Sequence, residues 1–151
     1  MYKKVLVPLD GSDLAECMLS HLKSLFEDGS VGEATLLNIV TIDIPWGDLE
    51  GGHFDLNALR EQVFAASNKY LSGVESRLSS QGIKVKTESV EANRPADTIT
   101  DYAKKNGIEL IIMATHGHSG FKKLMLGSVA AGVLNQSVVP ILLIRPEACR
   151  L

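Results

Sequence analysis

The chain alternates short apolar runs with longer segments in which apolar residues recur every three or four positions. The apolar runs span residues 3–9, 34–41, 108–114 and 138–145, and residues 83–90 have the pattern of a further strand. The segments with helical periodicity span residues 13–28, 56–78, 95–106 and 127–137. Strands that are nearly continuous apolar runs and alternate with helices indicate an open parallel sheet with helices on both faces. The sequence therefore predicts an α/β fold in the order β-α-β-α-β-α-β-α-β.

Length and composition limit the classes of protein that this chain can form. Its 151 residues support one hydrophobic core, so residues 1–151 are expected to form a single domain. A net charge of −3 without a long basic run argues against nucleic acid or an anionic membrane as a partner. No apolar stretch approaches the ~20 residues that span a bilayer, so a cytoplasmic location is expected. Cys17 and Cys149 lack CxxC spacing, which indicates neither a disulfide framework nor a zinc site.

Local signals predict where several segments begin and end. The spacing of Asp13 and Glu16 fits a capping box at the start of the first helix, which is expected to run unbroken to about Asp28. Pro95 suits the first turn of the third helix. Residues 42–55 contain a proline and three glycines, a composition typical of a long loop.

The loops after the first and fourth strands, PLDGS and MATHGHSG, are the candidate ligand sites, because such sheets bind ligands beyond the carboxyl ends of their strands. Gly117, Gly120 and Gly127 have no Cβ, so their backbone can approach a ligand closely. Ser128 begins a helix whose free N–H groups and dipole favour an anion. Phosphate suits this combination, although the pattern is neither GxxxxGK[ST] nor GxGxxG. Glycine spacing alone leaves an ordinary structural loop equally open.

Three other kinds of site are disfavoured by the same residues. His116 and His118 lie in a loop without a nearby cysteine or carboxylate, so metal binding is not favoured, and His116 is better explained by a hydrogen bond that holds the loop. Ser12 and Ser128 belong to no recognisable set such as GxSxG, so no catalytic residue is assigned and hydrolase activity is disfavoured. A flavoprotein is disfavoured because no run of serines and threonines follows the first strand.

The spacing Ala114-x2-Gly117-x9-Gly127-Ser128 resembles the nucleotide-binding signature of the universal stress protein family, G-x2-G-x9-G-[ST]. The segments VLVPLDGS, LIIMATHGHSG and VVPILLIRP resemble other landmarks of that family and occur in the same order, so the resemblance covers the whole chain. It implies a Rossmann-like, adenine nucleotide alpha hydrolase-like fold with five parallel strands in the order 3-2-1-4-5. It also implies a regulatory ATP-binding protein, with magnesium on the phosphates and at most slow ATP hydrolysis or autophosphorylation.

The resemblance implies roles for individual residues of this chain. Pro8, Leu9 and Asp10 would line the adenosine end, and the Asp10 carboxylate would accept hydrogen bonds from adenine or ribose. Ile39 and Met113 would pack on the adenine. The phosphates would be surrounded by Gly117, His118, Ser119, Gly120, Gly127, Ser128 and Val129, and Ala114 and His116 complete the predicted site. An aspartate just before a helix can also serve as its cap, and this alternative stays open for Asp10.

Ala114 departs from the family pattern, because it replaces the first glycine. Its methyl group would cost about 1–3 kcal/mol if the position required a positive φ, and almost nothing in an extended strand. We expect an extended conformation, because Ala114 directly follows an apolar run. The alternative function is a nucleotide-free interaction module of the same fold in the stress response.

Pro140 places the last strand at an edge of the sheet, because proline cannot donate to a strand ladder. An apolar edge needs a cover, and a second copy of the chain is the simplest one. The resemblance implies a homodimer through this strand, with Val139, Ile141 and Leu143 as interface residues. The alternative is that these three side chains face the helices of their own chain.

His118 generates a prediction about pH. A histidine that faces phosphate attracts it more strongly when protonated, and the unperturbed pKa of histidine is ~6.5. We expect ATP to bind more tightly as the pH falls from about 7.5 to about 6, and His118→Ala to flatten this dependence. Calorimetric titration at both pH values measures the effect, and an equal slope in the variant would contradict the contact.

Overall fold

The computed structural model describes residues 1–44, 54–115 and 126–145, so most of the loop predicted over residues 42–55 lies outside these ranges. The strands are β1 (Tyr2–Pro8), β2 (Val31–Val40), β3 (Val85–Glu91), β4 (Leu110–Ala114) and β5 (Ile141–Ile144). The helices are α1 (Asp13–Glu16), α2 (Leu19–Glu27), α4 (Leu56–Ser79), α5 (Pro95–Lys105) and α6 (Ser128–Gln136). The strands form one parallel sheet in the order β3-β2-β1-β4-β5, which confirms the predicted fold class and strand order.

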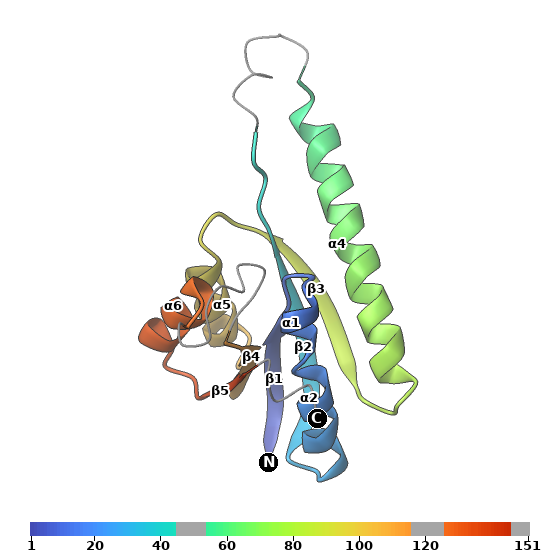
Figure 1. Ribbon diagram of the computed structural model, residues 1–151, viewed down its shortest axis with the longest axis vertical. Coiled ribbons are helices and arrows are strands. Elements are labelled where there is room, and N and C mark those ends of the chain that lie inside the picture. Colours follow the sequence, from blue (N-terminus) through green and yellow to red (C-terminus); the bar gives the residue numbers. More distant parts are fainter. Residues whose placement is uncertain (45–53, 116–125, 146–151) are drawn as a thin grey trace.

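The strand order places helices on both faces of the sheet (Figure 1). From β1 the chain adds β2 and then β3 on one side, and it afterwards crosses back to add β4 and β5 on the other side. Because such crossovers are right-handed, α1, α2 and α4 cover one face, whereas α5 and α6 cover the other. The order of the strands therefore reverses between β1 and β4 at the centre of the sheet.

The hydrophobic core lies where the central strands meet the helices. Val5, Leu6 and Val7 of β1 and Ile111 and Ile112 of β4 are fully buried. Strands covered on both faces have this continuous burial, and each large side chain contributes about 1.5–3 kcal/mol to stability. Within the described residues, every helix is too short or too polar to cross a bilayer.

The first helical segment differs from its prediction. It is divided into α1 and α2 at Cys17 and Met18 rather than running unbroken. Ser12 caps α1, because its Oγ accepts a hydrogen bond of 3.0 Å from the backbone N–H of Ala15. The predicted capping box is therefore wrong, since Asp13 is already the first helical residue.

Two further side chains of this segment depart from expectation. The Arg77 guanidinium of α4 donates to the Glu16 carboxylate at 2.6 Å, so Glu16 joins α1 to α4 instead of capping α1. Cys17 is disulfide-bonded, which the spacing of the cysteines did not indicate.

β5 lies at one edge of the sheet, as Pro140 predicted. Val139, Ile141 and Leu143, the predicted interface residues, are partly buried and pack against the core of their own chain. Leu142 points to the other side of the strand, where 38% of its surface is exposed. The edge strand therefore keeps apolar surface in contact with solvent.

Helices α5 and α6 pack closely at Gly132. A Cβ atom at this position would lie 2.6 Å from the Cβ of Ala96. Carbon atoms in contact are normally separated by about 3.5–4.0 Å, so any side chain at Gly132 requires the helices to move apart. Ala96 lies in the first turn of α5, and Gly132 lies four residues after the first residue of α6, so the contact also fixes the starts of both helices.

This contact predicts the effect of adding one methyl group. We expect Gly132→Ala to lower the free energy of unfolding by about 1–3 kcal/mol, although alanine is the better helix former. Removing the opposing methyl group in Gly132→Ala/Ala96→Gly should restore part of the loss. The control is Gly73→Ala on α4, where the described residues leave open space and a gain of about 0.5–1 kcal/mol is expected. Urea denaturation measures all three, and equal stability of the two single variants would contradict the packing.

Candidate functional site

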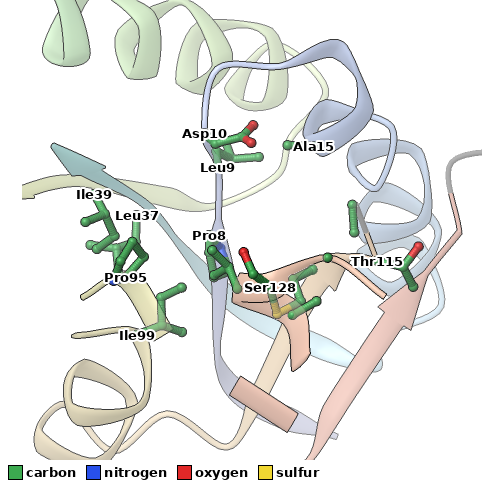
Figure 2. Close-up of a pocket in the computed structure, with 15 residues that line it drawn as sticks. Pro8, Leu9, Asp10, Ala15, Leu37, Ile39, Pro95, Ile99, Thr115 and Ser128 are labelled. Carbon is green, nitrogen blue, oxygen red and sulfur yellow. The ribbon is translucent and has the colours of Figure 1, made fainter. Parts of the chain in front are cut away.

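A cavity of about 300 Å³ opens at the carboxyl edge of the sheet, where β1 and β4 separate (Figure 2). β1 pairs with β4 at Val5 and Leu6. On their outer sides, β1 pairs with β2 as far as Pro8, and β4 pairs with β5 as far as Ala114. The two central strands therefore stop pairing with each other before they end, and the cavity occupies the space between their last residues.

The structure gathers most of the predicted site residues around this cavity. Those that line it are Pro8, Leu9, Asp10, Ile39, Met113, Ala114, Gly127, Ser128 and Val129. The other predicted site residues, His116, Gly117, His118, Ser119 and Gly120, lie outside the described residues.

The sequence did not predict several residues that line the cavity, namely Ala15, Leu37, Pro95, Ile99, Thr115 and Ala130. The position of Leu37 could have been inferred, because it lies two residues before Ile39 and therefore on the same face of β2. No sequence pattern indicates that Pro95 and Ile99 line the cavity, because their position depends on how α5 crosses the sheet.

One side of the cavity is apolar. Leu37 and Ile39 of β2 lie beside Pro95 and Ile99 of α5, as Figure 2 shows, and Met113 of β4 lines the same cavity. These side chains carry no charge and no hydrogen-bonding group. They form walls that suit a flat apolar ring rather than a charged group.

The start of α6 forms another side. Gly127 is the N-cap of α6 and has a φ of −60°, and no side chain of the described residues caps this helix. The first intrahelical hydrogen bond runs from Ala131 N to Gly127 O at 2.8 Å. The N–H groups of Ser128, Val129 and Ala130 come before it, so the helix itself provides no acceptor for them. This end of the cavity therefore offers backbone donors and the positive end of a helix dipole to an anion.

Gly127 is useful because it has no side chain, and not because of its backbone conformation. Any residue can adopt a φ of −60°, so backbone conformation does not require glycine at this position. The absence of a side chain at the cavity wall is what distinguishes Gly127 from other N-cap residues. Its N–H also donates to the Thr115 carbonyl at 2.8 Å, which joins the two ends of the loop between β4 and α6.

Ala114 is the last residue of β4 and pairs with Ile144 of β5. The prediction of an extended conformation is therefore confirmed, and the methyl group costs no backbone strain. The strand pairing continues for one residue, because Thr115 N donates to the Ile144 carbonyl at 2.9 Å.

Asp10 borders the cavity just beyond β1, and its Oδ1 accepts hydrogen bonds from the Ser12 N–H at 3.0 Å and the Ser12 hydroxyl at 2.5 Å. Gly11 between them has a φ of +83°, a conformation that favours glycine. The alternative that Asp10 caps the helix is wrong, since Ser12 is the cap. Asp10 instead binds Ser12, and this contact fixes the Asp10 carboxylate at the rim of the cavity.

Tyr70 of α4 is a neutral neighbour of Asp10. Burial of the phenol, followed by the negative charges of Glu16 and Asp10, raises the pKa of Tyr70 well above its ordinary value. A phenol is neutral at physiological pH even without this shift, so Tyr70 adds no charge to the rim.

The strand order, the helices on both faces and a cavity at the reversal point define a Rossmann-like α/β protein. Residues 1–145 match the model of the Universal stress protein family. The chain belongs to this family.

Relatives of the chain extend over almost its whole length. Universal stress protein YxiE of Bacillus subtilis is 30% identical over 151 residues, which cover 96% of this chain and 100% of YxiE. The solved structure of MJ0577 from Methanocaldococcus jannaschii has a TM-score of 0.80 and 30% identity, and the match covers 96% of both chains. The AMP-bound structure of At3g01520 from Arabidopsis thaliana shares the fold, with a TM-score of 0.66, 15% identity, and coverage of 95% of this chain and 91% of that one.

Proposed function

We propose that this chain is a cytoplasmic universal stress protein that binds ATP as a regulatory ligand in a stress response. The observation that carries the proposal is that one cavity has apolar walls at one side and the uncapped start of α6 at another. An adenine nucleotide has matching parts, a flat apolar base and an anionic phosphate chain. The AMP bound to the Arabidopsis relative supports this class of ligand.

The base would lie between β2, β4 and α5. Ile39 and Met113 would contact its faces, and Pro95 would close the slot. Burying the flat surface of adenine among these side chains provides apolar contact energy. The Asp10 carboxylate, held at the rim by Ser12, would accept hydrogen bonds from the ribose or the base.

The phosphates would lie at the start of α6. Backbone N–H groups and the Ser128 hydroxyl would donate to the phosphate oxygens, and the helix dipole would favour their charge. The residues outside the described ranges that were predicted for this site, including His118, would complete the phosphate contacts.

Magnesium would be held mainly by the phosphates. No group of three or more histidine, cysteine, aspartate or glutamate side chains in the described part of the chain could hold a metal ion. Mg²⁺ commonly binds through substrate phosphates and keeps several waters, so this site does not need a cage of carboxylates. Among the described residues, Ser128 lines the cavity with a hydroxyl that would be able to contact the magnesium ion.

Regulatory binding fits the site better than catalysis. Asp10 is the only ionisable side chain among the described residues that line the cavity, and its Oδ1 is engaged by Ser12. A dedicated general base would need to reach the proton that it removes. Alanine in place of the first family glycine is no argument for a nucleotide-free module, because Ala114 is in a strand conformation that leaves the backbone unstrained.

Gly127→Val tests the placement of the phosphates. We expect the unaltered chain to bind Mg-ATP and the variant to bind at least about tenfold more weakly, because the new side chain would occupy the phosphate space. Isothermal titration calorimetry measures both affinities. The matched control is Gly73→Val, an exposed position on α4. Equal affinity of Gly127→Val and the control would contradict this placement, and absence of binding by every chain would support the nucleotide-free module.

We also propose a homodimer through β5. The strand lies at the sheet edge and follows Pro140, and the exposed apolar side chains include Leu142 of β5, Val138 before it and Leu134 of α6. Pairing with a second copy across a two-fold axis would cover both the open edge and these side chains. Val139, Ile141 and Leu143, which are only partly buried by their own chain, would lose further exposed surface in such a pair.

Leu142→Asp tests the dimer. A carboxylate in the centre of an apolar interface loses its hydration, so we expect the variant to sediment as a monomer where the unaltered chain sediments as a dimer. Analytical ultracentrifugation at several concentrations measures this difference. Tyr2→Ser at an exposed position of β1 is the control and should leave the mass unchanged. A dimer that persists in Leu142→Asp would place the interface elsewhere.

A further inference from the structure

Uncharged polar side chains connect the middle of α4 to the end of β1. The Ser67 hydroxyl of α4 donates to Asn38 Oδ1 of β2 at 2.7 Å. Asn38 Nδ2 donates to the Leu9 carbonyl at 2.7 Å. The hydroxyl of Ser89 on β3 lies 2.6 Å from that of Ser67. We call Asn38, Ser67 and Ser89 the Asn38 network.

Asn38 interrupts an apolar strand on the side away from the cavity. Leu37 and Ile39 line the cavity, and side chains alternate along a strand, so Asn38 faces α4. A polar side chain in such a place is costly unless its groups are hydrogen-bonded. The amide meets this requirement because it supplies both a donor and an acceptor, and each has a partner.

The hydroxyl hydrogens set the direction of the network. The Ser67 hydroxyl donates to Asn38 Oδ1. Either hydroxyl can be the donor in the short contact between Ser67 and Ser89, and Ser89 also donates to Oδ1 of the exposed Asn68 at 3.0 Å. The donors of Ser67 and Asn38 follow one another toward Leu9.

The network ends at a peptide that borders the cavity. Leu9 N donates to the Leu37 carbonyl at 2.8 Å, and the Leu9 carbonyl accepts from Asn38, so β2 holds both polar groups of Leu9. The peptide bond is planar, so fixing the Leu9 carbonyl also fixes the Asp10 N–H, which points in the opposite direction. The next residue, Gly11, turns the chain at a φ of +83°. Asn38 therefore holds the Leu9–Asp10 peptide, which leads into this turn.

We propose that Asn38 and Ser67 are positioning residues for the nucleotide site, and that they hold the Leu9–Asp10 peptide in the orientation that places Asp10 against the adenosine end. This role rests on the proposed function. The single backbone acceptor of the network is the carbonyl of a residue that lines the cavity. Two apolar side chains could fill the same space between β2 and α4, but they would leave that carbonyl without its donor.

Asn38→Asp tests the donor with almost no change in shape. The new carboxyl keeps an acceptor for Ser67, but as a carboxylate it repels the Leu9 carbonyl. Partial burial raises the pKa of such a carboxyl, so a larger fraction of it is protonated and able to donate at about pH 6 than at about pH 8.5. We expect the variant to bind Mg-ATP about tenfold more weakly than the unaltered chain at the higher pH, and within about threefold of it at the lower pH. Comparing each variant with the unaltered chain at the same pH removes the contribution of other groups.

Two further variants separate positioning from stability. Ser67→Ala removes the support of the Asn38 amide and should weaken Mg-ATP binding by about threefold at both pH values. Val74→Ala destabilises the same helix at a buried apolar position outside the network, and it should leave the affinity unchanged well below its unfolding temperature. If Asn38→Asp and Val74→Ala change the affinity equally, or if the Asn38→Asp ratio does not change with pH, the proposal is overturned.

A measurement without nucleotide separates this proposal from the proposed function. The side-chain amide protons of Asn38 should exchange with solvent slowly in NMR spectra, and faster in Ser67→Ala, whereas those of the exposed Asn68 should exchange fast in both. Fast exchange at Asn38 in the unaltered chain would overturn the network itself. Absence of Mg-ATP binding by the unaltered chain would instead refute the proposed function and the positioning role with it. Normal binding by Asn38→Asp would overturn the positioning role alone.

Discussion

The early separation of β1 and β4 is the constraint on which the rest of the site depends. Pairing between them stops at Leu6 and Ile111, so beyond these residues each strand is paired on its outer side alone. β1 is held by its ladder with β2 and by the side chain of Asn38. β4 is held by its ladder with β5, and Thr115 just beyond it accepts a hydrogen bond from the start of α6. Each strand end is secured from its outer side, and the inner sides border the cavity.

The helices contribute to the cavity in different ways. α5, α6 and α1 place residues in its wall, and the starts of α5 and α6 lie directly at it. α4, the longest helix among the described residues, lines none of it and lies against the opposite face of the sheet (Figure 1). It supports the site indirectly, through Ser67 and Asn38 of the sheet and through Arg77, which binds Glu16 of α1. Ligand contact thus falls to the strand ends and the other helices, whereas α4 supports their backbone.

Local patterns predicted the fold well, because burial on both faces produces continuous apolar strands whose residues are neighbours in sequence. The sheet order came from the family resemblance and not from periodicity. The break at Cys17 was not predictable, since the apolar spacing continues across it. The cap was misassigned because Asp13 and Glu16 fit a motif, whereas Ser12 makes the hydrogen bond. Ile99 escaped prediction because its place in the wall is set by long-range packing that no local spacing encodes.

The contact between Gly132 and Ala96 has a consequence for how this chain can diverge. The space between α5 and α6 holds one methyl group, so the two positions share a fixed volume. A methyl group can move from one helix to the other during evolution, but it cannot be added to both. Each helix begins at the cavity, so a relative with side chains at both positions would have both helix starts displaced. Its cavity would therefore have a different shape.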